Sequence, residues 1–85
     1  MASYSLRIKP SAAKELEGLS LADRKRTVAK IRRLAADPRP PGVEKLSGQE
    51  KYRLRQGDYR ILYLIDDGDA SVVVAKIGHR REVYR

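Results

Sequence analysis

From residue 51 the chain reads Lys51-Tyr-Arg-Leu-Arg-Gln-Gly-Asp-Tyr-Arg-Ile-Leu-Tyr-Leu-Ile-Asp66, two alternating runs on either side of a Gly-Asp pair. Alternation with period two predicts strands over 51–56 and 59–66, and the Gly-Asp pair predicts a tight hairpin turn between them. A third strand is predicted over 70–77, where a near-continuous apolar run suggests burial on both faces. Three successive strands with short connections predict an antiparallel meander.

The N-terminal half predicts one strand and two helices. Residues 4–9 alternate as a strand would, and apolar residues recur at helical spacing over 11–19 and 21–36. Ser20 and Asp23 have the spacing of a capping box at the start of the second helix. The residues predicted to face inward from the strand and the second helix are Tyr4, Leu6, Ile8, Leu21, Val28, Ile31 and Leu34 or Ala35.

The elements therefore follow the order β-α-α-β-β-β, with residues 43–48 predicted as a loop before the meander. This order predicts one α+β domain over residues 1–85. Its two N-terminal helices would pack on one face of a small, mostly antiparallel sheet. The other face of the sheet is left for a partner or a substrate.

The chain of 85 residues is strongly basic, with 19 Lys and Arg against 11 Asp and Glu and a formal charge of +8. Such a balance predicts a polyanionic partner, either nucleic acid, an acidic protein, or both. Cysteine is absent, which excludes disulfides and thiolate metal sites and fits a reducing compartment. No apolar run approaches the length of a membrane span and no signal-peptide pattern opens the chain, so we expect a cytoplasmic protein without a membrane partner.

Basic residues are predicted to gather on the open face of the sheet. Successive side chains of a strand point to opposite faces, so alternate residues of 51–55 share a face, and the closing stretch 77–85 follows the last strand. The groups predicted to converge there are Lys51, Arg53, Arg55, Arg60, Arg80 and Tyr84.

This set excludes several chemistries. It contains no Ser or Cys nucleophile with a plausible base, no His and carboxylate cluster for zinc, and no acidic pair for the magnesium of a two-metal nuclease. It is compatible with a metal-free cut of RNA, in which the 2′-hydroxyl of the substrate attacks the adjacent phosphate and cations stabilise the growing charge. No cofactor is predicted.

Three further features have two interpretations each. The cations of the second helix form a solvated face, which we favour, or dock the domain on a phosphate-rich surface. Residues 66–69 are acidic, but their spacing does not match a calcium loop and favours a turn. His79 could be a base, although alternation places it opposite Arg80, which favours a structural or surface role.

Four segments of the chain resemble the RelE branch of the RelE/ParE toxin superfamily, and the resemblance extends over nearly the whole sequence. These segments are Lys9-Pro-Ser-Ala-Ala-Lys-Glu-Leu16, Lys51-Tyr-Arg-Leu-Arg55, Gly57-Asp-Tyr-Arg-Ile-Leu-Tyr63 and Ile77-Gly-His-Arg-Arg-Glu-Val-Tyr84. The family fold is a small sheet with two N-terminal helices, which agrees with the order predicted above.

The resemblance implies a toxin of a type II toxin–antitoxin pair. RelE-type members enter the A site of the 70S ribosome and cut mRNA there without metal, leaving a cyclic phosphate. The implied partners are the ribosome, mRNA and a RelB-like antitoxin, with operator DNA bound only through the antitoxin. The alternative is a ParE-like gyrase inhibitor, or an inactive module whose main role is to bind its antitoxin.

The resemblance also implies roles for individual residues. The family's catalytic and phosphate-binding positions fall on Lys51, Arg53, Arg60, Arg80 and Tyr84. Arg60 and Arg80 would hold the scissile phosphate, and Tyr84 would orient the nucleotide or act as base. Lys51 is the preferred proton mover, because an ammonium among other cations can lose its proton while arginine effectively cannot. Arg53 stands where the best-known member has lysine, which puts a proton-transfer role there in doubt. The residues expected to bind RNA or rRNA are Arg55, Arg81, Arg24, Lys25, Lys30 and Arg33.

Overall fold

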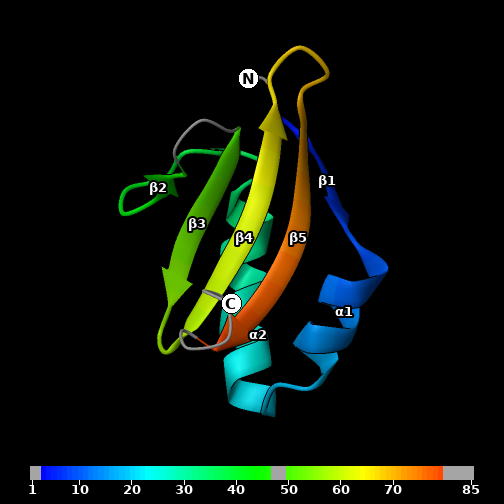
Figure 1. Cartoon of the computed structure of the whole chain (residues 1–85), viewed down its shortest axis with the longest axis vertical. Coiled ribbons are helices and arrows are strands. Elements are labelled where there is room, and N and C mark those ends of the chain that lie inside the picture. Colours follow the sequence, from blue (N-terminus) through cyan, green and yellow to red (C-terminus); the bar gives the residue numbers. More distant parts are fainter. Residues whose placement is uncertain (1–2, 47–49, 80–85) are drawn as a thin grey trace.

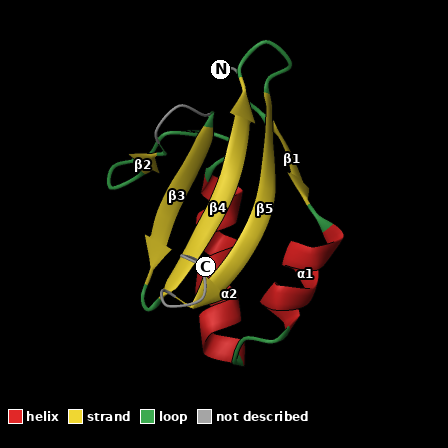
Figure 2. Ribbon diagram, viewed as in Figure 1, coloured by secondary structure: helices red, strands yellow, loops and turns green. Residues whose placement is uncertain are grey.

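The computed structural model describes residues 3–46 and 50–79. Within these ranges the chain forms two helices and five strands, and both helices lie on the same side of the sheet (Figures 1 and 2). The elements are β1 (Ser5–Ile8), α1 (Pro10–Glu17), α2 (Leu21–Arg33), β2 (Glu44–Lys45), β3 (Lys51–Gln56), β4 (Tyr59–Asp66) and β5 (Ser71–His79). The predicted α+β fold is confirmed, and neither helix in the described part is long and apolar enough to cross a membrane.

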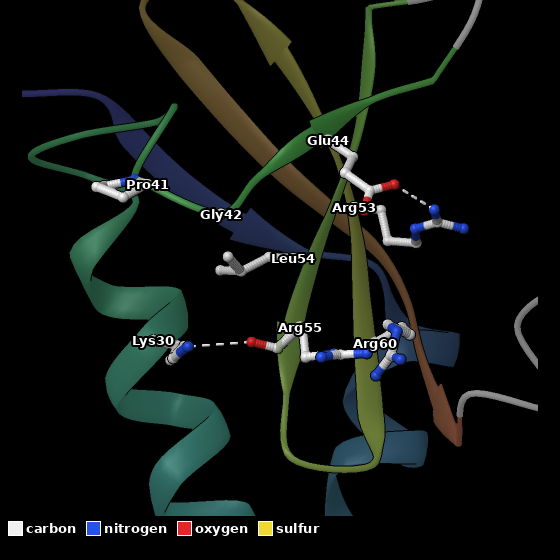
Figure 3. Close-up of a pocket in the computed structure, with 8 residues that line it drawn as sticks. All are labelled: Lys30, Pro41, Gly42, Glu44, Arg53, Leu54, Arg55 and Arg60. Atoms are coloured by element: carbon white, nitrogen blue, oxygen red, sulfur yellow. Dashed lines mark hydrogen bonds and ion pairs between the residues drawn. The ribbon is translucent and has the colours of Figure 1, made fainter.

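The strands form a five-stranded sheet in the order β1-β5-β4-β3-β2. β1 runs parallel to β5, and the other neighbours are antiparallel, as the predicted meander requires. β2 corrects the prediction of a loop over 43–48, because Glu44 and Lys45 pair with Arg53 and Tyr52. Beyond this short pairing the edge of β3 lies beside α2, where the Lys30 ammonium donates to the Arg55 carbonyl at 3.0 Å (Figure 3).

Both helices begin and end for local reasons. Pro10, one of the two predicted starts beside Ser11, opens α1 with a backbone angle that suits a helix start, and α1 ends at Glu17, short of the predicted Leu19. Ser20 caps α2 by accepting from the Asp23 N–H at 3.3 Å, which confirms the predicted cap. α2 ends at Arg33, short of the predicted residue 36, because the chain tightens into i→i+3 hydrogen bonds there.

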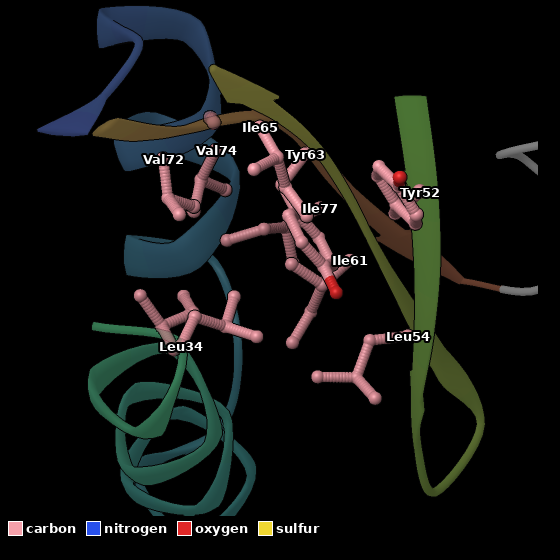
Figure 4. Close-up of a cluster of buried hydrophobic side chains, with 11 residues drawn as sticks. Leu34, Tyr52, Leu54, Ile61, Tyr63, Ile65, Val72, Val74 and Ile77 are labelled. Atoms are coloured by element: carbon pink, nitrogen blue, oxygen red, sulfur yellow. The ribbon is translucent and has the colours of Figure 1, made fainter. Parts of the chain in front are cut away.

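The core lies between the helices and one face of the sheet (Figure 4). Tyr52 and Tyr63 stack within it, with ring centroids 5.8 Å apart. The buried apolar residues are Ala12, Ile31, Leu34, Tyr52, Leu54, Ile61, Tyr63, Ile65, Val72, Val74 and Ile77. Ile61, Tyr63 and Ile65 of β4 share the buried face. The predicted burial of β5 on both faces is only partial, because Val73 is half-buried and its neighbour Leu64 is 37% exposed.

Two predicted core residues lie at the surface. Leu21 is 58% exposed and Ile8 is 37% exposed. The predicted Ile31 and Leu34 are buried, and Thr27, which was not predicted, is buried with them at positions i, i+4 and i+7 along α2 and its C-cap. The helix is therefore rotated from the orientation that Leu21 and Val28 predicted, and a threonine takes the central core position.

An irregularity between β4 and β5 decides which side chains of β5 face outward. Leu62 pairs with Lys76 but Tyr63 pairs with Val74, so Ala75 is an extra residue in β5. Strict alternation from Val74 would turn Lys76 into the core. The bulge instead places Ile77 in the core and Lys76 on the face away from the helices.

Candidate nucleic-acid interface

The sheet face away from the helices is rich in cations on β3, β4 and β5. Residues directly opposite each other in neighbouring strands share a face, with Cβ atoms roughly 5 Å apart. Arg55 pairs with Arg60, and Arg53 with Leu62, which in turn pairs with Lys76. We call this surface the cationic face and define it by Lys51, Arg53, Arg55, Arg60 and Lys76.

A cleft of about 400 Å³ opens at the β3 edge of the cationic face (Figure 3). Arg53, Arg55 and Arg60 contribute to it from the sheet, and Lys30 from α2. We call it the edge cleft, and its lining residues are Lys30, Pro41, Gly42, Glu44, Arg53, Leu54, Arg55 and Arg60. The fold thus brings together three of the predicted sheet arginines and one predicted lysine of the second helix.

Arg60 is held more firmly than a surface arginine. The residue is only 7% exposed, and its Nη1 donates to the carbonyls of Tyr59 at 3.1 Å and Gly57 at 3.4 Å. Gly57 has a positive φ of 59°, which the predicted two-residue turn requires and which glycine adopts without strain. The hairpin turn therefore supplies the acceptors that orient the Arg60 guanidinium.

Arg55 lies directly across from Arg60 on the neighbouring strand. Like charges in this arrangement destabilise a sheet unless an anion lies between them. Two guanidinium groups in one cleft also present the fork geometry that suits phosphate oxygens. The pair is therefore a natural place for a phosphate group.

Lys51 shares the cationic face but does not line the edge cleft. It is half-buried and lies opposite Leu64, four residues along β3 from Arg55. At the usual rise of a strand, about 13 Å separates these two positions. Lys51 therefore lies nearer the far end of the face than the arginines of the cleft.

The predicted RNA-binding residues of the second helix separate into two groups. Lys30 lines the edge cleft, and Arg33 follows it by three residues, so both lie on the same side of α2. Arg24 and Lys25 instead line a groove with Val28, on another side of the helix. Only the first pair adjoins the sheet arginines.

Arg80, Arg81 and Tyr84, which were predicted from the closing stretch, lie outside the described residues. Lys76 is a cation of this face that the sequence pattern did not predict, because the bulge at Ala75 places it there. The available signal was the polar Lys76 directly before Ile77, which breaks the apolar alternation of the strand.

His79 lies on the helix-facing side of the sheet. Its ring meets the Tyr59 ring edge-on, with centroids 5.9 Å apart and an interplanar angle of 84°. The adjoining pocket includes Glu15 and Gly18 of the α1 end, and Glu15 Oε1 accepts from the Ile77 N–H at 3.0 Å. This position agrees with the structural role favoured for His79.

The acidic turn over 66–69 is used internally. Asp67 accepts two hydrogen bonds from Arg39 and one from the Tyr4 hydroxyl, and Asp66 Oδ1 accepts from the Asp69 N–H at 3.0 Å. The Arg39 guanidinium, with help from Tyr4, lowers the pKa of Asp67 to about 2. Across the described ranges, no three His, Asp or Glu side chains gather as a metal site would need.

A second surface lies between β1 and the helices. It is a groove of about 210 Å³ with apolar walls and arginines at its rim. We call it the helix groove, lined by Leu6, Arg7, Ile8, Leu16, Val28, Ile31 and Arg32. Its apolar walls and basic rim suit an acidic segment that carries apolar side chains.

The comparison with known proteins agrees with this architecture. Residues 6–84 match the family model described as the ParE toxin of the type II toxin–antitoxin system parDE. RelE in the archaeal RelE–RelB complex from Pyrococcus horikoshii is 30% identical, with a TM-score of 0.84 over 92% of this chain and 96% of that one. The isolated RelE toxin of E. coli is 29% identical, with a TM-score of 0.80 over 96% of this chain and 92% of that one.

Toxin RelG of Mycobacterium tuberculosis is 44% identical over 34 residues, which are 40% of this chain and 39% of RelG. The fold is that of a class of small toxins, and the family match spans almost the whole chain. The chain belongs to the RelE/ParE superfamily of type II toxin–antitoxin toxins.

Proposed function

We propose that this toxin is a ribosome-dependent endoribonuclease that cuts mRNA in the ribosomal A site and so stops translation. The observation that carries the proposal is the edge cleft, where Arg53, Arg55 and Arg60 converge on one face of the sheet. Such a cluster neutralises phosphate charge and supplies the electrostatic part of a phosphodiester cleavage.

The proposed reaction uses a nucleophile that belongs to the RNA. The 2′-oxygen bonds to the adjacent phosphorus, the bond to the 5′-oxygen breaks, and the products are a 2′,3′-cyclic phosphate and a 5′-hydroxyl. One proton leaves the 2′-hydroxyl and one joins the departing 5′-oxygen. No metal takes part in these steps.

Arg60 is proposed to hold the scissile phosphate, because its burial and its two carbonyl acceptors already orient its guanidinium. Arg53 and Arg55 would stabilise the charge that grows on the phosphate oxygens. Proton transfer is assigned to Lys51 and Tyr84, and the second phosphate ligand to Arg80. Arg81, Lys30 and Arg33 would bind neighbouring RNA or rRNA, with Arg24 and Lys25 as a separate contact.

An antitoxin is the proposed protein partner. The P. horikoshii relative was crystallised as a RelE–RelB complex. A formal charge of +8 favours fast association with an acidic partner. The helix groove is the proposed binding site for an acidic antitoxin segment that carries apolar side chains. Operator DNA would be bound only through the antitoxin.

The test is a purified translation complex with a defined codon in the A site and an end-labelled mRNA. The full-length toxin should cut that mRNA once in the codon and leave a cyclic phosphate. A single 2′-deoxy substitution at the cut nucleotide should block the reaction, because the nucleophile is then missing. Cleavage of the deoxy mRNA would refute the mechanism, and equal cleavage without ribosomes would refute ribosome dependence.

The match to the ParE model favours a second candidate, a gyrase-directed toxin on the same fold. It predicts no mRNA cleavage and a block of purified gyrase instead. An inactive module that only binds its antitoxin predicts neither effect. Assaying translation and supercoiling with one protein preparation separates the three candidates.

A further inference from the structure

Glu44 brings a carboxylate to the edge cleft, among the arginines that face its opening. Arg53 Nη2 donates to Glu44 Oε2, and the two residues are direct cross-strand partners on β3 and β2. Figure 3 shows the Arg53 guanidinium turned toward Glu44, while the Arg55 side chain extends toward Arg60. The carboxylate therefore takes up a guanidinium fork that a phosphate would otherwise use.

The two partners differ in how easily they can separate. The Arg53 side chain is 19% exposed, and its strand is paired on both sides at this position. The Glu44 side chain is 66% exposed and stands on a two-residue strand that follows Gly42, whose φ is 86°. Releasing Glu44 to water costs little, because most of its side chain is already exposed and water readily solvates its carboxylate.

We propose that Glu44 is an internal competitor of RNA phosphate, which holds the Arg53 guanidinium until a phosphate of the substrate displaces it. This inference rests on the proposed RNA-binding role of the cationic face. Glu44 is a positioning residue that acts through Arg53 and takes no part in the bond changes. Its effect is to weaken binding of an RNA phosphate at Arg53, because the phosphate must first displace the carboxylate.

The experiment measures the affinity of the full-length chain for a labelled single-stranded RNA with 2′-O-methyl groups throughout, at about 0.15 M salt. This RNA cannot be cut through its 2′-oxygen, so the result does not depend on nuclease activity. The variants are Glu44→Gln, Arg53→Ala and the double variant. Glu17→Gln is the matched control, because it removes the same charge from an exposed position on α1.

Glu44→Gln should tighten binding by about two- to fivefold, the range of an exposed ion pair. Glu17→Gln should have a smaller effect, because salt screens charges beyond roughly 8 Å. In the Arg53→Ala background, Glu44→Gln should change nothing, because the guanidinium for which it competes is gone. Glu44→Ala should tighten RNA binding as Glu44→Gln does. Agreement of the two variants would show that the gain comes from loss of the carboxylate and not from the introduced glutamine.

Equal gains in both Arg53 backgrounds would overturn the proposal, because Glu44 would then act only through general charge. A gain from Glu17→Gln as large as that from Glu44→Gln would do the same. Absence of a gain in an RNA-binding protein would show the pair to be an ordinary cross-strand contact. Absence of any RNA binding by the wild type and the Glu44 variants would overturn the RNA-binding role of the cationic face, and this inference with it. Failure of the nuclease proposal alone would leave this affinity pattern unchanged.

Discussion

Arg39 donates two parallel hydrogen bonds to the carboxylate of Asp67, at 3.1 and 2.8 Å, and so ties the loop after α2 to the β4–β5 turn. Arg39 Nε also donates to the Tyr52 hydroxyl at 3.1 Å, and the Tyr4 hydroxyl donates to Asp67 at 2.7 Å. The Tyr63 hydroxyl adds a bond of 2.7 Å to the Pro38 carbonyl of the same loop. This network joins the loop after α2 to β3, β4 and the β4–β5 turn.

The network predicts acid-dependent stability. The pKa of Asp67 is held at about 2, chiefly by Arg39, against about 3.9 in an unfolded chain. A lowered pKa in the folded state means that this contribution is fully present above about pH 4 and is lost as the pH falls through about 2. Asp67→Asn should therefore lower the urea midpoint at pH 6, and its curve should meet that of the wild type near pH 2.

The matched control is Asp58→Asn, because Asp58 is an exposed carboxylate in the other hairpin turn. It should not change the acid limb of the curve. A gap between wild type and Asp67→Asn that stays constant from pH 6 to pH 2 would contradict the assignment.

Thr27 predicts a stabilising substitution. The residue is fully buried at the centre of the α2 core face, and its Oγ1 has no hydrogen-bond partner in the described part of the chain. Replacing a buried unpaired hydroxyl by a methyl removes a desolvation penalty of about 1 kcal/mol or more. Thr27→Val should raise the free energy of unfolding by about that amount in urea titrations.

Thr27→Ser is the companion variant, because it keeps the hydroxyl and deletes the methyl. It should lower the free energy of unfolding by about 1 kcal/mol for the lost buried group. If Thr27→Val proved less stable than the wild type, the Thr27 hydroxyl would have to make a stabilising hydrogen bond in the folded protein.

Arg55 predicts a conflict between stability and binding. Its positive charge lies opposite the buried Arg60, and cross-strand like charges cost roughly 0.2–1 kcal/mol. Arg55→Gln should raise the free energy of unfolding at low salt and weaken RNA binding at the same time. The backbone carbonyl that accepts from Lys30 is retained in this variant.

Urea titrations at low and high salt check this effect, because screening should remove most of the gain. Lys14→Gln, an exposed charge change on α1, provides the control. A gain in stability that is the same at both salt concentrations would have to come from packing rather than from charge.

The faces of β3 and β4 were predictable because strand alternation is strict there. Arg53 and Arg55 share a face, and Tyr52 and Leu54 take the other, as the sequence pattern indicates. Lys76 was not predictable by the same rule, because the bulge in β5 shifts the phase of alternation by one residue. A bulge forms from tertiary pairing and leaves only a weak local signal.

The second helix shows why apolar spacing alone can mislead. Leu21 fits the helical pattern but is 58% exposed, while Thr27 is fully buried. The first turn of α2 extends past the sheet, so Leu21 has no strand to pack against (Figure 1). Glu44 and Lys45 have no strand signature of their own, and their pairing depends on the position of β3.

The helix groove predicts where antitoxin binding can be weakened without loss of RNA binding. Ile8 is a wall of this groove and is 37% exposed. Ile8→Asp removes apolar surface and adds a charge that repels an acidic partner, so binding should weaken by tenfold or more, since a buried isoleucine is worth about 1.5–3 kcal/mol.

Leu21→Asp is the control, because Leu21 is more exposed than Ile8 and lies outside the groove. Calorimetric titration with the cognate antitoxin should show a large change for Ile8→Asp and a small one for Leu21→Asp. Equal effects of the two substitutions would remove the groove from the proposed interface.

We propose that the cationic face around Arg60 cuts mRNA on translating ribosomes. The most direct measurement maps mRNA 5′ ends in cells after brief induction of the wild-type chain. The control is the Arg60→Gln variant, first shown to bind the antitoxin. For the wild type we predict new mRNA 5′ ends that are confined to translated frames and lie at a fixed position within codons. These ends should be absent with the Arg60→Gln variant. Growth arrest with intact mRNA, or the same 5′ ends with the Arg60→Gln variant, would contradict cleavage at the cationic face.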